Sequence, residues 1–201
     1  RKIDKGQMSL MFKKAEIVSF TRDLLETFEQ QTRVKKLDLK FHTSAPEIEM
    51  WIDPKNFDKI ILNLLSNACK FTPENGQVEI SLSTGEDTHL PQNAPLRRYV
   101  ELTVADSGIG IASTEREHIF ERFYQIRNSQ NNSNIGTGIG LHLTRSLVEL
   151  HYGNIHVEDN GEGRPGSRFI IRLPLGNGHL KKEEIEEATT AGTLINIPAA
   201  E

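Results

Sequence analysis

Residues 53–73 read DPKNFDKIILNLLSNACKFTP, and this stretch decides the fold. Asp53 is a candidate N-cap residue, and Pro54 stands at the first helical position, where its fixed φ angle suits a helix. The apolar residues that follow recur at helical spacing, and a set of polar residues falls within a roughly 60° sector beside them. The stretch therefore predicts a helix over residues 54–70 that buries its apolar face. The apolar stripe consists of Phe57, Ile60, Ile61, Leu64, Leu65 and Ala68, and the polar stripe of Asn56, Asn63, Asn67 and Lys70.

The elements on either side of this helix favour an α+β fold. Helical spacing runs from residue 15 to about residue 34, and further helices are expected over residues 114–120 and 140–150. Residues 85–96 and 125–134 have the composition of loops. The expected strands lie mostly in neighbouring pairs, which suits a two-layer α/β sandwich with one mixed sheet better than a doubly wound sheet. These strands cover residues 37–41, 78–82, 99–104, 154–158 and 168–173, and the second and third of them are expected to form a hairpin.

Composition excludes several classes of protein. The chain has 201 residues, with 24 Lys and Arg against 28 Asp and Glu, a net charge of -4 and 36% hydrophobic residues. That length suits one domain with short flanking segments, and the acidic balance argues against binding nucleic acid or an anionic membrane. No apolar run approaches the roughly 20 residues that a membrane span needs, and the charged start of the chain is not a secretory signal. With Cys69 as its single cysteine, we expect a soluble intracellular protein without an internal disulfide.

The polar stripe of the 54–70 helix is a candidate ligand site. Asparagine is a poor helix former, so a solvated helix face more often carries Glu, Lys or Gln. An amide oxygen such as that of Asn67 is a hard, neutral ligand suited to Mg²⁺, and Lys70 follows one turn on, where it can meet phosphate. The alternative is an ordinary solvated face.

A second candidate follows a predicted strand, at Asp106-Ser107-Gly108-Ile109-Gly110. The glycines permit positive φ or a close approach of the backbone to a ligand. A carboxylate at the end of a strand can accept a hydrogen bond from an exocyclic amine. The alternative is an ordinary Asp-Ser-Gly turn.

A third candidate opens the predicted helix over residues 140–150, at Gly136-Thr137-Gly138-Ile139-Gly140. Unpaired N–H groups and the helix dipole can meet an anion there. The motif is not the dinucleotide fingerprint, because an Asn-rich loop rather than a strand precedes it, and it is not a P-loop, because no Gly-Lys-Ser/Thr follows. A flexible hinge at a helix start is the alternative.

Taken in order, these motifs resemble the N, G1, F and G2 boxes of the catalytic, ATP-binding domain of sensor histidine kinases. The resemblance covers roughly residues 15–175, and it implies a two-layer α/β sandwich of the Bergerat type that binds Mg-ATP between its helical layer and a lid. The same fold serves DNA gyrase, mismatch-repair ATPases and heat-shock chaperones. The matching segments are residues 63–73, 106–110, 119–124 and 136–141, and Gly166-Ser167-Arg168-Phe169 resembles the closing glycine motif.

The resemblance assigns a role to each matching position. It implies that Asp106 recognises the adenine amino group, that Asn67 coordinates Mg²⁺ with help from Asn63, and that Lys70 neutralises phosphate charge. Gly108 and Gly110 would make room for the adenine ring, Gly136, Gly138 and Gly140 would let the lid close, and Phe120 and Phe123 would pack at its base or in the core. The other expected nucleotide-binding positions are Phe71, Tyr124, Thr137, Leu141 and Ser167.

Two departures from the family pattern affect the expected activity. Many members carry an arginine after the position of Tyr124, but here it is Gln125, which leaves Arg122 and Arg127 as candidates for contacting the γ-phosphate. None of the seven histidines precedes an acidic residue, as the family's phosphoacceptor does, so all seven are expected to be structural or at the surface. The acceptor is therefore expected on a dimerisation domain outside this sequence, and the chain alone should not phosphorylate itself.

The resemblance also predicts the surroundings of this domain. Residues 1–14 are expected to end a dimerisation hairpin, residues 15–175 to form the ATP-binding domain, and residues 176–201 to lead toward a possible receiver domain. The expected partners are the phosphoacceptor domain and a response regulator or fused receiver, with this chain monomeric and the full protein a homodimer. We expect the cytoplasmic part of a membrane-bound sensor.

One residue separates a kinase from an ATPase of the same fold. The hydrolytic relatives use a glutamate one turn before the metal-binding asparagine, and that position here is Asn63. A primary amide cannot take a proton from water at neutral pH, whereas a neutral imidazole already has a lone pair for phosphoryl transfer. We therefore expect a histidine kinase. A degenerate nucleotide-binding docking module is the alternative, and a nucleotide-free interaction domain is the most remote.

Overall fold

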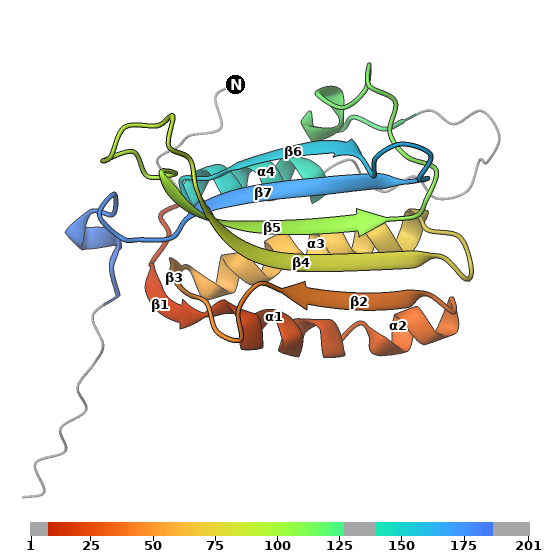
Figure 1. Ribbon diagram of the computed structural model, residues 1–201, viewed down its shortest axis with the longest axis horizontal. Coiled ribbons are helices and arrows are strands. Elements are labelled where there is room, and N and C mark those ends of the chain that lie inside the picture. Colours follow the sequence, from red (N-terminus) through yellow and green to blue (C-terminus); the bar gives the residue numbers. More distant parts are fainter. Residues whose placement is uncertain (1–7, 127–139, 187–201) are drawn as a thin grey trace, which may run out of the picture.

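The computed structural model describes residues 8–126 and 140–186 (Figure 1). Within the described residues, the first half of the chain forms three strands and three helices. They are β1 (Lys13–Glu16), α1 (Ile17–Glu26), α2 (Glu29–Val34), β2 (Asp38–Thr43), β3 (Glu49–Ile52) and α3 (Pro54–Phe71). The second half comprises β4 (Gln77–Glu86), β5 (Arg98–Asp106), a 3₁₀ turn (His118–Phe120), α4 (Gly140–Leu150), β6 (Asn154–Asp159), β7 (Ser167–Pro174) and a second 3₁₀ turn (Lys182–Glu184).

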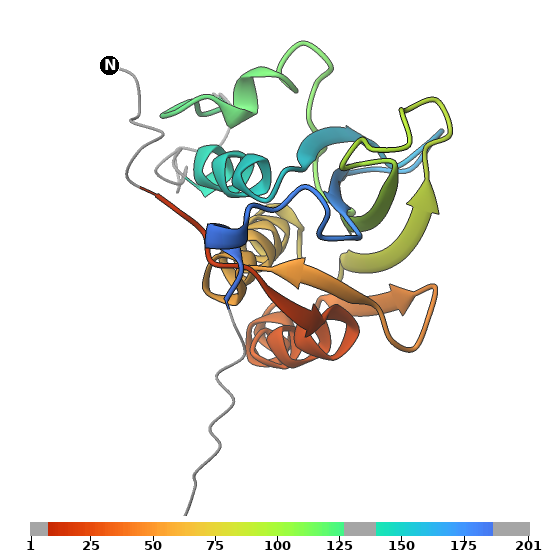
Figure 2. The ribbon, with the colours of Figure 1, turned by 90° about the vertical axis from the view of Figure 1, so that its left-hand side faces the viewer.

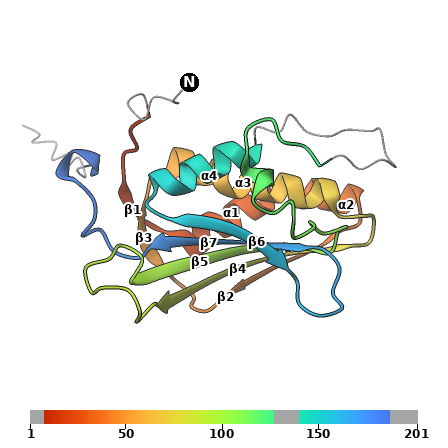
Figure 3. The same ribbon diagram turned by 90° about the horizontal axis from the view of Figure 1, so that it is seen from above.

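The main sheet has the strand order β2-β4-β5-β7-β6, and the helices cover one of its faces (Figure 3). β2 and β4 are parallel, because α3 crosses between them, and the other neighbours are antiparallel. The predicted α+β sandwich with one mixed sheet is therefore confirmed, as is the β4–β5 hairpin. β1 and β3 form a separate two-stranded sheet that the sequence did not reveal.

The core lies between the helices and the sheet. All six residues of the predicted apolar stripe of α3 are buried, which confirms the face assigned to this helix. Burying a side chain of this size stabilises the fold by about 1.5–3 kcal/mol, so α3 is a rigid support for its polar stripe. The sheet contributes to the same core Val78, Ile80 and Leu82 of β4, Val100, Leu102 and Val104 of β5, and Phe169, Ile171 and Leu173 of β7.

Two predicted helices differ from the observed ones. The helical pattern over residues 15–34 breaks at Thr27 and Phe28, because the Thr27 hydroxyl bonds back to the carbonyl of Leu24 at 2.6 Å while Phe28 turns into the core. Residues 114–120 form turns and one 3₁₀ turn rather than a helix. Bonds between residues three apart, such as His118 N–H to the Glu115 carbonyl at 3.0 Å, replace a continuous α-helical ladder there.

Asp53 caps α3 in a different way from the predicted one. Its backbone carbonyl accepts from the N–H groups of Asn56 and Phe57 at 3.1 and 2.7 Å, but its side chain makes no capping bond. The carboxylate instead accepts from Met11 N–H and from the Asn56 side-chain amide, both at 3.1 Å. Asp53 therefore fixes the N-terminal segment to the start of α3.

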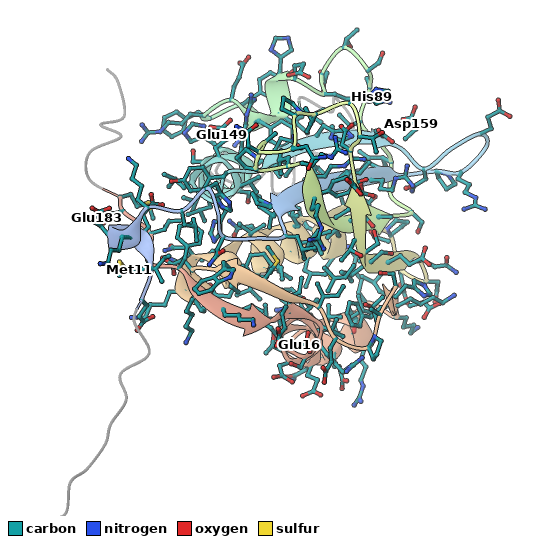
Figure 4. All side chains as sticks on the ribbon, turned by 60° about the vertical axis from the view of Figure 1, so that its left-hand side comes forward. Met11, Glu16, His89, Glu149, Asp159 and Glu183 are labelled. Atoms are coloured by element: carbon teal, nitrogen blue, oxygen red, sulfur yellow. The ribbon has the colours of Figure 1, made fainter. Side chains whose placement is uncertain are left out.

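The segment before β1 packs against the segment after β7 (Figure 2). Phe12 is 1% exposed, its N–H donates to the Glu184 carbonyl at 2.6 Å, and its own carbonyl accepts from Glu186 N–H at 2.8 Å. Met11 and Glu183, labelled in Figure 4, lie on the two segments. Residues 8–14 and 176–186 thus join the packed body, while the domain limits at residues 14 and 175 stay predictions.

Replacing Tyr152 by phenylalanine should loosen this junction without unfolding the domain. The Tyr152 hydroxyl donates to both carboxylate oxygens of Glu184, at 2.8 and 2.7 Å. Burial, together with Glu184, raises the pKa of Tyr152 to about 12, so the hydroxyl stays protonated at neutral pH. Losing this bond removes up to about 3 kcal/mol of local stability. We expect faster amide hydrogen exchange at Phe12 and Glu186.

The control for this experiment is Tyr99→Phe, which keeps the aromatic ring that faces Arg172 at 4.2 Å. It should leave exchange at Phe12 and Glu186 unchanged. Equal exchange in Tyr152→Phe and the unchanged protein would show that the backbone bridge alone holds the two segments together.

Candidate functional site

Asp106 ends β5 with a carboxylate that is almost removed from water. Its side chain is 7% exposed. Oδ1 accepts from Gly108 N–H and Oδ2 accepts from the Ser167 hydroxyl, both at 2.9 Å. Burial raises the pKa of Asp106, and the two hydrogen bonds oppose that rise. A carboxylate has about four lone-pair positions, so this one can still accept from a ligand.

The glycines after Asp106 are needed by the protein's own packing. A Cβ on Gly108 would lie 2.6 Å from the Phe71 carbonyl oxygen and 2.9 Å from Asp106 Oδ1. Gly110 has φ +76°, a conformation that favours glycine. Both residues therefore fix the loop beside Asp106, and the close approach of an adenine ring stays a prediction. Phe71 itself is 50% exposed, so its ring is accessible to a ligand.

The polar stripe of α3 divides into residues with partners and residues without. The Asn56 amide donates to the Asp53 carboxylate, so Asn56 has a structural role and needs no ligand to account for it. The side chain of Asn67 is half-buried and makes no hydrogen bond to any residue in the described ranges. Lys70 is exposed, with Nζ 5.5 Å from the centre of the Phe71 ring. The part of the stripe that is available to a ligand is therefore its C-terminal end.

Asn63 lies against the first turn of α4. Its amide nitrogen is 3.4 Å from the Gly140 carbonyl oxygen and 3.3 Å from Thr144 Oγ1. The Thr144 hydroxyl is buried and also donates to Gly140 at 2.8 Å. Thr144 was not predicted as a site residue, although it lies four residues, or one helical turn, after Gly140. The two predicted motifs of α3 and α4 thus meet at Asn63.

The oxygen atoms that α3 offers fit a hard cation that is bound mainly through phosphate oxygens and only partly by the protein. Among the residues that the structure describes, no three His, Cys, Asp or Glu side chains gather in a metal-binding group. The amide oxygen of Asn67 has no protein partner there, and an amide oxygen suits Mg²⁺, which keeps several water or phosphate ligands. Asn67 therefore fits a Mg²⁺ ion that is bound chiefly through phosphate oxygens.

The segment over residues 119–124 has one buried and one exposed phenylalanine. Phe120 is 5% exposed and meets Phe169 edge to face, with ring centres 6.2 Å apart, so its packing role is confirmed. Phe123 is 62% exposed with φ +65°, so the prediction that it packs in the core or at the lid base is not supported by burial. The guanidinium of Arg122 lies 4.8 Å from the Phe123 ring. Tyr124 stacks on His118 at 5.6 Å, and burial with Glu115 raises its pKa.

Part of the predicted lid lies outside the described residues. This holds for Gly136, Thr137 and Gly138, and for Arg127. Gly140 begins α4, where a Cβ would meet nothing within 4 Å in the described part of the chain. Leu141 is partly buried against the core, so its side chain contributes to the seating of α4.

The seven histidines all lie in the described ranges, and their contacts are structural or on the surface. His42, His118 and His156 are exposed and pair with glutamates at 2.7–3.0 Å. His151 is 2% exposed, and burial lowers its pKa. Its Nδ1 bonds to the Leu147 carbonyl at 2.7 Å and its Nε2 accepts from Asp53 N–H at 3.2 Å. A histidine with both ring nitrogens in use has no lone pair for phosphoryl transfer.

One surface cavity is separate from Asp106. It has a volume of about 730 Å³ and lies between α2 and α3, beside Lys35, Ser66 and Lys70. Lys35 Nζ is already bonded to the carbonyls of Cys69 and Lys70 at 2.6 and 3.0 Å. This cation therefore serves as a cap for the C-terminal end of α3.

Comparison with known proteins agrees with this geometry. Residues 52–177 match the family described as histidine kinase-, DNA gyrase B-, and HSP90-like ATPase. The sensor histidine kinase TmoS of Ectopseudomonas mendocina is 37% identical over 174 residues, which are 87% of this chain and 16% of that protein. The hybrid signal transduction histidine kinase D of Dictyostelium discoideum is 33% identical over 189 residues, 92% of this chain and 12% of that protein. The nucleotide-free catalytic domain of histidine kinase ThkA has a TM-score of 0.68 and 25% identity, covering 83% of this chain and 97% of that one.

Proposed function

Because this chain belongs to the histidine kinase-, DNA gyrase B- and HSP90-like ATPase family, as an ATP-binding catalytic domain of the sensor histidine kinase type, we propose that it transfers the γ-phosphoryl group of Mg-ATP to a histidine. The acceptor would lie on a dimerisation domain, not among the seven histidines of this sequence. The chain spans no more than 16% of the length of the two curated relatives described above.

The observation that carries this proposal is Asn63 at the contact between α3 and α4. The hydrolytic enzymes that share this fold need a carboxylate at this position to take a proton from water. Asn63 offers an amide 3.4 Å from the Gly140 carbonyl, and an amide is no general base. A neutral imidazole needs no such base, so phosphoryl transfer depends on positioning and charge neutralisation.

Different residues in the described ranges would position the nucleotide and neutralise its charge. Asp106 would accept from the adenine amino group, while Asn63 and Lys70 would act at the phosphates. Asn67 would hold Mg²⁺, which when bound neutralises phosphate charge and orients the γ-phosphoryl group. Lys70 is exposed one turn beyond Asn67, so its ammonium is accessible to a phosphate from solvent. Arg122 is the described cation that we propose for the γ-phosphate, and it is exposed beside Phe123.

The partners follow from the same proposal. Phosphohistidine made by such a kinase would pass to a response regulator or to a receiver domain fused to the same protein. Hybrid kinases occur among the relatives, as the Dictyostelium protein shows by its name. No helix in the described ranges is long and apolar enough to cross a bilayer. We propose that the domain works in the cytoplasm as part of a membrane-bound homodimeric sensor.

Asp106→Asn tests the nucleotide assignment. The variant should bind ATP more weakly by about 1.5–3 kcal/mol, the range of a hydrogen bond to a charged group. GTP should bind poorly to the unchanged protein, because its six-position presents a carbonyl oxygen to the carboxylate. Calorimetric titration of ATP and GTP, each with Mg²⁺, measures both effects. Asp38→Asn, which removes an exposed carboxylate at the edge of the sheet, is the charge control.

The variant should also remain folded. The raised pKa of Asp106 means that its charged form is disfavoured in the folded state, so a neutral side chain relieves a cost. Asparagine can still accept from Gly108 N–H and can donate to the Ser167 oxygen. Equal affinity for ATP and GTP in the unchanged protein would exclude adenine recognition by Asp106, and absence of ATP binding would favour a docking module.

A further inference from the structure

The turn between β6 and β7 contains one side chain that reaches back to the site. After Asp159, labelled in Figure 4, the chain turns through Gly161, Gly163 and Gly166, which all have positive φ. Residues 161–165 are exposed, but Asn160 is half-buried and Gly166 is buried. Asn160 belongs to none of the motifs that the sequence predicts as binding residues.

Asn160 ties this turn to the residue that ends β5. Its amide nitrogen donates to the Asp106 carbonyl at 2.6 Å and to the Pro165 carbonyl at 2.9 Å. One side chain thus closes the base of the turn and attaches it to the backbone of Asp106. Both donors of the amide are used, which fixes its orientation.

The turn and Asp106 are packed too closely for any other residue at position 166. A Cβ on Gly166 would lie 1.7 Å from the Asp106 carbonyl oxygen, and Gly166 has φ +97°. The next residue is Ser167, whose hydroxyl donates to Asp106 Oδ2. The placement of that hydroxyl therefore depends on how the turn sits on Asp106.

The sheet itself does not make this connection. The β5–β7 ladder ends at the pair Ala105 and Arg168, one residue short of Asp106 and Ser167. Beyond that point Asp106 pairs with Val78 on β4, and Ser167 pairs with Asp159 on β6. The Asn160 amide therefore adds a bond from the β6–β7 turn to the backbone of Asp106, beside the bond that the Ser167 hydroxyl makes to Asp106 Oδ2.

We propose that Asn160 is a positioning residue for recognition of the nucleotide base. By holding the turn on the Asp106 backbone, it keeps the Ser167 hydroxyl on Oδ2 and orients the carboxylate toward an exocyclic amine. This rests on the proposed function, since the base that Asp106 reads is that of ATP. A residue that only stabilised the turn would affect all nucleotides alike, whereas Asn160 should affect the discrimination between bases.

The test compares Asn160→Ala and Asn160→Asp with the unchanged 201-residue chain. Asn160→Asp keeps the size of the side chain but removes both donors. Calorimetric titrations with Mg²⁺ use ATP, GTP and inorganic tripolyphosphate, which lacks a base. Asn177→Ala is the control, because Asn177 is exposed and contributes only its backbone carbonyl to a described hydrogen bond. Thermal melting is recorded for each protein.

We expect ATP affinity to fall about tenfold in both Asn160 variants, the equilibrium equivalent of one hydrogen bond. The ratio of ATP to GTP affinity should narrow, while tripolyphosphate affinity stays unchanged. An unchanged ratio, or an equal loss for all three ligands together with a lower melting temperature, would overturn the inference. If the unchanged chain binds no ATP, the proposed function fails as well.

Discussion

Asn67→Ala is expected to abolish the part of the ATP affinity that depends on Mg²⁺, while the fold stays intact. The amide oxygen of Asn67 has no partner in the described ranges and is the described oxygen best suited to the cation. Without it, a bound Mg²⁺ would lose the amide oxygen that we assign to it on α3. Calorimetric titration with and without Mg²⁺ should give the same ATP affinity in the variant and different affinities in the unchanged protein.

The fold should tolerate this change for two reasons. Asn67 lies outside the buried stripe of α3, so its removal opens no cavity in the core. Alanine is also the better helix former, by up to about 0.7 kcal/mol. The melting temperature should therefore stay the same or rise, and a lost affinity in Asn67→Ala cannot be assigned to unfolding.

Asn56→Ala is the matched control. Asn56 belongs to the same polar stripe, but it lies about 16 Å nearer the start of α3 and bonds to Asp53. Its removal should leave the Mg²⁺ dependence intact and lower stability slightly. A Mg²⁺ effect that persists in Asn67→Ala would remove Asn67 from its assigned role, whereas equal effects in both variants would show that the stripe acts only through the helix.

The sequence predicted α3 well because a helix leaves a periodic pattern among residues that are close together in the chain. Periodicity gives the angle of each side chain around a helix, and all six apolar positions of the stripe are buried. Angle alone, however, does not identify a partner. Asn56 and Asn67 share the polar sector, yet one is bonded to Asp53 and the other has no partner in the described part of the chain.

The missed elements depend on contacts between distant residues. β1 and β3 have four residues each, and their pairing, such as Lys13 with Ile52, gives no local pattern that exceeds the background. The same holds for Phe12, which is buried by pairing with Ile185 near the other end of the chain. Phe120 and Phe123 differ because the backbone turns at Phe123 with positive φ, so helical periodicity does not apply there.

The candidate site was predicted at its motifs and missed at the residues that connect them. Asp106, Gly108 and Ser167 do come together, although they lie at the end of β5, in the loop that follows β5 and at the start of β7. Thr144 and Asn160 act through a single hydroxyl and a single amide, which no spacing rule distinguishes from ordinary polar residues. Their partners, Asn63 and Asp106, are known only once the helices and strands are in place.

The chain alone should bind ATP but show neither autophosphorylation nor appreciable hydrolysis. No histidine here is directly followed by the acidic residue that the acceptor should have. The buried His151 also uses both ring nitrogens in hydrogen bonds. Incubation with γ-labelled ATP, followed by separation of protein and free phosphate, measures both reactions. Adding a dimerisation hairpin, fused or as a separate domain, should restore acid-labile phosphohistidine. The separate domain should react more slowly, because effective concentration is lost.

Asn63→Glu turns the same assay into a test of the missing base. A carboxylate at position 63 would stand close to the first turn of α4 and beside the Thr144 hydroxyl, which would have to leave the Gly140 carbonyl in order to donate to it. We expect slow phosphate release in Asn63→Glu and none in Asn63→Gln, which has the same size but cannot accept a proton from water. Stable label on the unchanged chain, or rapid phosphate release from it, would place the acceptor or the base within these 201 residues and contradict the proposed division of labour.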